Sequence, residues 1–250
     1  MNDDGLQRKV FLVTGSGRGL GAAIARAAGS ERARVVANCR FDGASLEAVT
    51  AEVERAGGEV LRARADVCLP EEAKALVERV IERWGRVDVL VNTVGEFHWD
   101  GLVELEPEAW RRVMSSNLDS VFHMCRFAIP HMRRQRFGRI VNFATVGAAT
   151  SRGEPQRAAY SAAKAGVVAL SRSLALEEAR YGITVNVVAP GLLRDEPAGA
   201  PEGDAPLGDR VPVGHAGVAA DVVRAVLFFA SPAAEFVTGQ VLEVAGGARN

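Results

Sequence analysis

The sequence predicts a single-domain α/β protein whose core is a doubly wound, seven-stranded parallel sheet with helices on both faces. Short runs rich in β-branched residues alternate with helical patterns along almost the entire chain, as in proteins whose parallel strands are joined by crossover helices. The first run leads directly into a glycine-rich turn and a helical segment. No repeat, low-complexity tract or linker divides the 250 residues, so we expect one domain over residues 1–250.

Seven runs have the composition of buried strands, with valine in each. They are residues 10–15, 34–39, 59–66, 87–92, 138–145, 184–190 and 240–245. Helical patterns lie between them, for example at 45–57 and 71–85, where apolar residues recur every three or four positions and a glycine ends the segment. Seven strands in one sheet suit a chain of this length.

One stretch departs from this alternation. Residues 194–215 are rich in Pro and Gly, so they cannot form regular structure, and they are longer than an ordinary connection. A lid over a binding site would have this composition, and so would a surface insertion.

Composition and charge exclude several classes of function. The 30 Lys and Arg residues nearly balance 31 Asp and Glu residues, so the chain has no global positive field for binding nucleic acid. Its apolar stretches are too short to span a bilayer, and its first residues lack the charge pattern of a secretory signal. The three cysteines and four histidines show no metal-binding spacing. We expect a cytoplasmic protein with reduced thiols, no metal, no membrane association and no nucleic-acid partner.

A glycine-rich turn, TGSGRGLG at 14–21, connects the first expected strand to a helical segment. Backbone N–H groups of such a turn can approach a pyrophosphate, whose charge is stabilised by the unpaired amides and the dipole at the helix N-terminus. A tight structural turn would also use glycine, so this element alone leaves both possibilities open. For a nucleotide, the binding residues would be Gly15, Ser16, Gly17, Arg18, Gly19, Leu20 and Gly21.

The end of the second expected strand indicates which nucleotide would bind. A Rossmann-type site reads the adenosine ribose there, with an acid for the 2′-hydroxyl of NAD or an arginine for the 2′-phosphate of NADP. Cys39 and Arg40 occupy this place, and Arg18 supplies a second guanidinium on the same side. These residues favour NADP(H) over NAD(H). Alternatively, Arg40 is a solvated loop arginine for which Asp42 competes.

Four further residues are candidates for catalysis. Tyr160 and Lys164 open a helical run at 158–179, and their spacing of four places both side chains on one helix face. The nearby ammonium favours the phenolate, which makes the Tyr160 phenol a stronger acid. Thr145 ends the strand expected at 138–145, where open α/β sheets bind ligands, and can hydrogen-bond a carbonyl. Asn117 lies in an apolar helical run at 110–125, where a structural and a functional role are equally open.

Taken together, these motifs resemble the short-chain dehydrogenase/reductase family, in particular compact single-domain members similar to 3-oxoacyl-[acyl-carrier-protein] reductases. The resemblance runs from about residue 8 to residue 247. Each motif alone is weak, but all of them occur in the family's order. They are TGSGRGLG (14–21), Asp66-Val67, Asn92 to Gly95, Asn117, YSAAK (160–164), VNVVAPG (185–191) and TGQVLEVAGG (238–247).

The resemblance implies an NADP(H)-dependent oxidoreductase that reduces a ketone or 3-oxoacyl group to a secondary alcohol. In it, Tyr160 protonates the carbonyl oxygen, Lys164 also binds the nicotinamide ribose, and Asn117 holds a water in a proton relay. The implied catalytic tetrad is Asn117, Thr145, Tyr160 and Lys164. The further cofactor residues that it implies are Asp66 and Val67 on the adenine side, Asn92 and Gly95 beside the cofactor, and Pro190 and Gly191 near the carboxamide.

The resemblance also implies partners. The substrate is a small carbonyl compound, which can be carrier-bound, and residues 194–215 form its binding loop. An acyl carrier would need basic surface, for which Arg133, Arg134, Arg136 and Arg139 are candidates. Phe97 and Trp99 either line an apolar substrate cleft or belong to the core. A homotetramer is expected, with the 110–125 and 158–179 helices packing across a two-fold axis.

The chain departs from the family pattern at several positions. Thr145 stands where a serine is usual, and it precedes Tyr160 by 15 residues instead of 13. Ser151 is therefore an alternative for this role, although we favour Thr145. Thr93 and Val94 replace an amide and a small residue, and Asp195 replaces a common threonine.

These departures keep two other classes of function open. A non-catalytic NADP(H)-binding sensor of the same fold would explain the altered residues, whereas an intact Tyr160 and Lys164 argue against it. An S-adenosylmethionine methyltransferase would explain the glycine turn but not that pair.

Overall fold

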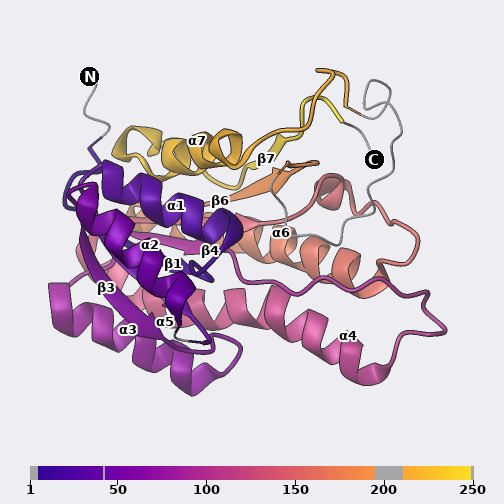
Figure 1. Cartoon of the computed structure of the whole chain (residues 1–250), viewed down its shortest axis with the longest axis horizontal. Coiled ribbons are helices and arrows are strands. Elements are labelled where there is room, and N and C mark those ends of the chain that lie inside the picture. Colours follow the sequence, from indigo (N-terminus) through magenta and orange to yellow (C-terminus); the bar gives the residue numbers. More distant parts are fainter. Residues whose placement is uncertain (1–4, 42, 195–210, 249–250) are drawn as a thin grey trace.

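The protein contains one seven-stranded sheet in which each strand is parallel to its neighbours (Figure 1). The structure is a computed structural model that describes residues 5–41, 43–194 and 211–248. Within these residues the strand order is β3-β2-β1-β4-β5-β6-β7. The predicted fold class is therefore confirmed, because this is the order of a doubly wound Rossmann sheet extended by one strand. The strands are β1 Val10–Thr14, β2 Arg34–Cys39, β3 Glu59–Arg64, β4 Val89–Asn92, β5 Gly138–Phe143, β6 Ile183–Pro190 and β7 Val241–Val244.

Several strands are shorter than predicted. We expected β5 to reach Thr145, but it ends at Phe143. The backbone N–H of Ala144 still donates to the carbonyl of Val188 at 3.0 Å, so the chain leaves the hydrogen-bonded ladder only at Thr145. The β-branched composition continues past the ladder here, and composition does not show where the pairing stops.

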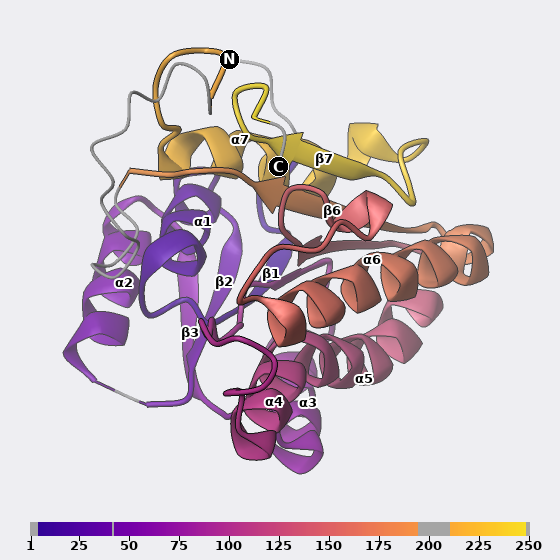
Figure 2. The same cartoon turned by 90° about the vertical axis from the view of Figure 1, so that its right-hand side faces the viewer.

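Helices cover both faces of the sheet (Figure 2). One layer packs against the buried cluster of β1 side chains that includes Phe11, and the other against the cluster that includes Leu12. The first layer is α1 Gly19–Ser30, α2 Ala44–Arg55 and α7 Ala219–Ala230. The second is α3 Pro70–Trp84, α4 Pro107–Met114, α5 Ser120–Gln135 and α6 Ala158–Glu178. Short 3₁₀ turns occur at Ala148–Thr150, Ala179–Tyr181 and Pro232–Ala234.

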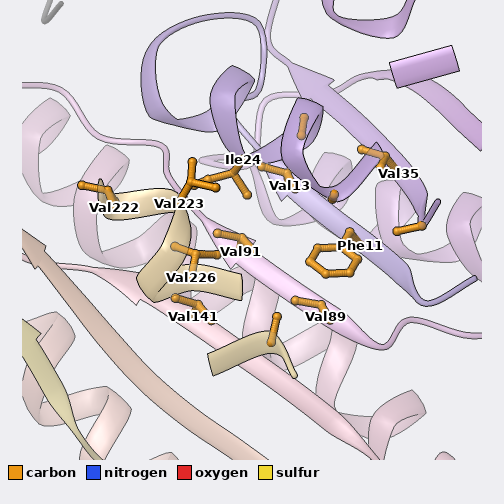
Figure 3. Packing of buried hydrophobic residues seen from close by; sticks show 14 of the residues in the cluster. Phe11, Val13, Ile24, Val35, Val89, Val91, Val141, Val222, Val223 and Val226 are labelled. Atoms are coloured by element: carbon orange, nitrogen blue, oxygen red, sulfur yellow. The ribbon is translucent and has the colours of Figure 1, made fainter. Parts of the chain in front are cut away.

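The core is divided between the two faces because successive strand residues point to opposite sides. In β1, Phe11 and Val13 face α1 and α7, whereas Val10 and Leu12 face α3 and α5. Figure 3 shows the first of these clusters, in which Ile24 of α1 and Val226 of α7 close over the β1 and β4 side chains. Burial on both faces explains why the central strands are apolar along their whole length.

The helical run predicted at 110–125 is interrupted. Between α4 and α5 the chain forms a π-helical turn, Ser115–Asp119. The residues at which it joins the two α-helices, Ser115 and Asp119, keep right-handed helical dihedral angles. A π turn inserts an extra residue into the helix and often marks a functional site. Here it contains Asn117, which is fully buried.

Three predicted features, Asp42 among them, fall wholly or partly outside the described residues. Asp195 and most of the loop expected at 194–215 belong to the undescribed range 195–210. The base of the loop is described, and there the N–H of Arg194 donates to the carbonyl of Gly217 at 2.9 Å, within an isolated parallel bridge between Leu193 and Gly217.

The expectation that Arg139 contributes basic surface is wrong. Its side chain is buried, and its guanidinium donates to the carbonyls of Ser231 and Pro232, each at 3.2 Å, and to those of Gly138 and Gly182. The Gly138 and Gly182 carbonyls lie at the amino ends of β5 and β6, whereas those of Ser231 and Pro232 belong to the turn after α7, so Arg139 joins this edge of the sheet to that turn. A basic run in the sequence therefore divides between surface and interior.

The strand order reverses at β1 and β4, which are adjacent although β2 and β3 separate them in sequence. Open α/β sheets bind ligands at the carboxyl end of the strands at such a switch point. Thr14 and Asn92, the last residues of the two strands, are paired there. In the described part of the chain, no helix has the length and apolarity that crossing a bilayer requires.

Candidate active site

The glycine-rich turn lies between β1 and α1, at the switch point. Gly15 and Gly19 have φ values of +65° and +54°, a region that favours glycine. A Cβ on Gly21 would lie 2.5 Å from the Gly15 carbonyl oxygen, so the helix can approach the turn this closely only with glycine there. No side chain caps α1, and its first turn has no acidic residue. The N-terminal amides of α1 are therefore suited to an anion.

Ser16 has a different surrounding from the rest of the turn. Its backbone N–H donates to the carbonyl of Asn38 at 2.8 Å, and its hydroxyl accepts the Asn38 N–H at 2.7 Å. Asn38 in turn donates from Nδ2 to the carbonyls of Ala63 and Ala65. Ser16 thus ties the turn to β2 and β3.

The end of β2 carries the residues expected to distinguish the two nucleotides. Arg40 is 62% exposed, and its guanidinium lies 4.5 Å above the Phe41 ring and 3.8 Å from the Asp66 carboxylate. A Cβ on Gly17 would lie 3.6 Å from the Ser45 hydroxyl, so the turn faces the first residues of α2. Asp42, the competitor expected for Arg40, is outside the described residues.

Asp66 and Val67 lie just after β3. The Asp66 carboxylate accepts the backbone N–H of Cys68 at 3.0 Å, and Val67 is buried. Burial and the neighbouring Asp66 carboxylate raise the pKa of the Cys68 thiol to about 12, so this thiol stays protonated. None of the three cysteines, all of which lie among the described residues, forms a disulfide bond.

The end of β4 is held by two sets of hydrogen bonds. Asn92 donates from Nδ2 to Oδ1 of Asn142 at 2.8 Å, and Asn142 donates to the Ser171 hydroxyl at 2.9 Å, which connects β4, β5 and α6. The Thr93 hydroxyl donates to the Thr14 carbonyl at 2.6 Å, and the Thr93 N–H donates to the Thr14 hydroxyl at 3.2 Å. Thr93, which departs from the family pattern, therefore joins the ends of β4 and β1.

Asn117 is oriented from two directions. Its Nδ2 donates to the carbonyl of Glu96 at 2.8 Å and to that of Val113 at 2.9 Å. Its Oδ1 is buried and has no hydrogen-bond partner in the described part of the chain. A Cβ on Gly95 would collide with this oxygen and would lie 3.6 Å from Nζ of Lys164. Gly95 therefore leaves a space that the Asn117 amide oxygen and the lysine ammonium both border.

Lys164 is buried, and its Nζ donates to the carbonyl of Phe143, at the end of β5, at 3.0 Å. Burial lowers its pKa to about 8, because desolvation disfavours the charged form. The same Nζ lies 5.5 Å from the centre of the Tyr160 ring. The expectation that the two side chains project together is met, since they lie one turn apart on α6.

The two candidates for the serine role differ in position. Thr145 is half-buried and follows β5 by two residues, so it remains at the carboxyl edge of the sheet. Ser151 is exposed, has a φ of +56° and ends the 3₁₀ turn Ala148–Thr150. Its position further from the sheet favours Thr145 as the residue beside the strand ends.

Pro190 ends β6, and Gly191 follows it at the same edge. The Gly191 N–H donates to the carbonyl of Val244 at 3.0 Å, and a Cβ on Gly191 would lie 2.8 Å from Ala245. The end of β6 is thus packed closely against the end of β7.

These residues form two groups along one edge of the sheet. Gly95, Asn117, Tyr160 and Lys164 converge at one end, whereas the glycine turn, Arg40 and Asp66 surround the end of β2. A helix end suited to an anion, a glycine-rich turn, and an unpaired amide oxygen that borders the same space as an ammonium fit a dinucleotide with its reactive end near Lys164. No group of three or more potential metal-ligating side chains occurs in residues 5–41, 43–194 and 211–248.

Sequence patterns missed two contributions and left the role of a third residue, Phe97, undecided. The Glu96 and Phe143 carbonyls, which orient Asn117 and Lys164, have no side-chain signal and depend on how the strands end. Phe97 contacts the Tyr160 ring edge-to-face, with 4.8 Å between ring centres. Its sequence position beside the Asn92–Gly95 motif was the only available signal, and it left a core role equally open.

Residues 15–249 match the family model described as enoyl-(acyl carrier protein) reductase. The chain is 39% identical over 245 residues to the 3-oxoacyl-[acyl-carrier-protein] reductase FabG of Haemophilus influenzae, an alignment that covers 97% of this chain and 98% of the relative. It is 36% identical to the protein of the same name from Staphylococcus aureus (strain Mu50), over 96% of this chain and 97% of the relative.

A solved structure is similarly close. A short-chain dehydrogenase/reductase from Burkholderia xenovorans, described as putative in its name, superposes with a TM-score of 0.89 at 38% identity. The match covers 97% of this chain and 96% of that one.

Proposed function

The chain belongs to the short-chain dehydrogenase/reductase family of oxidoreductases, and from this premise we propose that it is an NADP(H)-dependent reductase of a ketone or 3-oxoacyl group, with Tyr160 as general acid. The observation that carries the proposal is the convergence of the unpaired Asn117 oxygen and the Lys164 ammonium at Gly95, one helical turn from Tyr160. A protein that only senses a nucleotide has no need of such an acid.

The residues of this chain that would hold the cofactor lie along the carboxyl edge of the sheet. The amides that begin α1 would bind the pyrophosphate, Asp66 and Val67 would contact the adenine, and Lys164 would bind the nicotinamide ribose. When bound, the cofactor supplies the hydride for the carbonyl carbon. Gly95 and Pro190-Gly191 would adjoin its nicotinamide end.

The chain's own residues would manage the proton. The Tyr160 phenol would donate a proton to the carbonyl oxygen, and the Lys164 ammonium would stabilise the phenolate that remains. The Thr145 hydroxyl would hydrogen-bond the same carbonyl oxygen. The unpaired Oδ1 of Asn117 would accept a hydrogen bond from a water, through which Tyr160 is reprotonated by way of Lys164.

Two guanidinium groups support NADP(H) over NAD(H). Arg40 is exposed at the end of β2, and Arg18 is exposed in the glycine turn. Asp66 competes for Arg40, but a separation of 3.8 Å with most of Arg40 in solvent makes this a weak pair. Arg40 can therefore turn to a 2′-phosphate at little cost.

A carrier-bound substrate is supported by the relatives' names, whereas the basic surface at the end of α5 lies away from the candidate active site. Arg134, Arg136 and Arg180 are exposed there, while Arg133 is neutralised by the buried Glu178 carboxylate, to which it donates two hydrogen bonds. This surface is at the amino edge of the sheet, opposite the candidate active site.

The test is Tyr160→Phe, assayed by absorbance as NADPH is oxidised with diketones, quinones, free 3-oxoacyl thioesters and a carrier-bound 3-oxoacyl group. We expect kcat to fall by roughly 10²–10⁴-fold, because the variant lacks only the acid. The dissociation constant for NADPH, measured by fluorescence, should stay within about twofold of wild type. Retained turnover would defeat the assignment of Tyr160.

The alternative function is a non-catalytic NADP(H)-binding sensor. In the same assay, this alternative predicts that the wild-type protein binds NADPH but turns over no compound in the panel.

A further inference from the structure

The segment that follows β4 contacts two elements of the candidate active site. The Glu96 carbonyl accepts a hydrogen bond from Asn117, and the Glu96 N–H donates to the Ser116 hydroxyl at 3.0 Å. The next residue, Phe97, places its ring against Tyr160 at an interplanar angle of 65°. Residues 96 and 97 thus connect the π turn of Asn117 with the helix that carries Tyr160.

Phe97 is itself supported. The Trp99 ring packs edge-to-face on it at 4.8 Å and 66°, and the Arg157 guanidinium lies 4.0 Å from the Trp99 ring centre and 5.1 Å from that of Phe97. Glu154 forms an ion pair with Arg157. Arg157 directly precedes α6, so this stack joins the loop after β4 to the first turn of the Tyr160 helix.

A backbone contact fixes the same two segments. The N–H of Asp100 donates to the carbonyl of Gln156 at 3.2 Å. The segment from 96 to 100 therefore has a defined position relative to α6, although it forms no helix or strand.

The contact matters because Tyr160 is on the first turn of α6 and is only half-buried. Proton transfer needs the phenol oxygen within hydrogen-bond reach of the substrate, so the orientation of this ring matters for the reaction. Edge-to-face aromatic pairs have a preferred geometry. Phe97 meets the Tyr160 ring in that geometry while 39% of its own surface is exposed, so its burial alone does not explain its place.

We propose that Phe97 is a positioning residue for the reaction: its ring, held by Trp99 and Arg157, fixes the orientation of the Tyr160 phenol. The inference rests on the proposed role of Tyr160. Phe97 does not exchange a proton and acts only through the tyrosine ring.

The kinetic test compares Phe97→Ala, Phe97→Leu and Phe97→Tyr. We expect kcat to fall about 3- to 10-fold in Phe97→Ala, with a smaller change in the KM for the ketone, an intermediate loss in Phe97→Leu and near wild-type kcat in Phe97→Tyr, which keeps the ring. His98→Gln is the matched control, because His98 is the intervening residue and pairs with Asp100 instead. Its kcat should be unchanged.

A second measurement does not depend on turnover. The chain has two tyrosines, so fluorotyrosine labelling gives two ¹⁹F resonances, and Tyr181→Phe assigns them. In Phe97→Ala the Tyr160 resonance should shift and change in width as the ring gains freedom, while that of Tyr181 should not. Unchanged thermal unfolding of the variant would show that the fold is intact.

The outcomes separate this inference from the proposed function. If Phe97→Ala raises only the KM, or leaves the Tyr160 resonance unchanged, Phe97 merely lines the cleft and the positioning role is overturned. If Tyr160→Phe retains turnover, the proposed acid is wrong, whatever Phe97 does. Loss of kcat in Tyr160→Phe together with the graded loss in the Phe97 series supports both.

Discussion

Burial of Lys164 lowers the stability of the folded chain but places its charge where the proposed reaction needs it. A buried ammonium loses its hydration, and one hydrogen bond to the Phe143 carbonyl replaces only part of it. Its pKa is lowered from 10.5 to about 8 for this reason. Near neutral pH the charge is nevertheless retained, which is the form that can favour a phenolate at Tyr160.

We predict that Lys164→Met stabilises the cofactor-free protein while it abolishes turnover. Below about pH 8 the lysine is protonated in both the folded and the unfolded chain, so the full burial penalty, roughly 3 kcal/mol at most, opposes folding of the wild type. Between about pH 8 and 10.5 the unfolded chain binds more protons, so wild-type stability rises with pH and the advantage of the variant shrinks.

Urea unfolding at several pH values measures this difference. If the free energy of unfolding of Lys164→Met exceeds that of the wild type by an amount that does not decrease between about pH 8 and 10.5, the lysine pKa is not depressed.

At the scale of elements, the site depends on how each strand or helix ends. The π turn Ser115–Asp119 directs Asn117 inward between α4 and α5, where two backbone carbonyls hold its amide. Thr93 joins the ends of β4 and β1. Thr93 is fixed by the neighbouring strand and Asn117 by the loop that follows β4, so the strand ends position the site even though these residues lie outside the ladders.

The end of β2 leads to a prediction on cofactor choice. We expect a higher kcat/KM for NADPH than for NADH, and expect Arg40→Ala to lower the value for NADPH by about 10- to 100-fold, because a charge-assisted hydrogen bond to the 2′-phosphate is lost. The value for NADH should change little. Arg55→Ala is the matched control, since Arg55 is exposed at the far end of α2.

Steady-state kinetics with both nucleotides checks this prediction. A preference of the wild type for NADH would refute the assigned role of Arg40.

At the scale of the whole molecule, the apolar stripe on α4 and α5 is divided between core and surface. Val113, Val121 and Cys125 are buried, the last two in the cluster that includes Leu12 of β1, whereas Trp110 and Phe122 remain 38% and 44% exposed. Large aromatic side chains that stay exposed on packed helices are typical of surfaces that associate. The stripe thus supplies more apolar surface than one chain buries.

We predict that the protein is a homotetramer in solution and that Trp110→Glu combined with Phe122→Glu reduces it to a smaller species, because charges replace the aromatic surface. Analytical ultracentrifugation at micromolar concentration measures both proteins. Circular dichroism should show that the variant retains its helices. A wild-type protein that sediments as a monomer would contradict the expectation.

Sequence alone determined the α/β class and the number of strands in the sheet, and it supplied the residues that are proposed for the site. Valine-rich runs and crossover helices have patterns that are visible in the sequence. The glycine turn is a local motif, and the Tyr160–Lys164 spacing places both residues on one face of any helix. The burial of both faces of β1 follows from its apolar composition for the same reason.

Only the tertiary structure decided which groups meet. The place where β5 ends, the burial of Arg139, the carbonyls that orient Asn117 and Lys164, and the contact of Phe97 with Tyr160 all depend on segments far apart in sequence. Backbone acceptors are the same for every residue type, and an aromatic ring suits a core or a cleft equally well. Composition therefore cannot distinguish these cases, whereas the packing of strand ends against helices does.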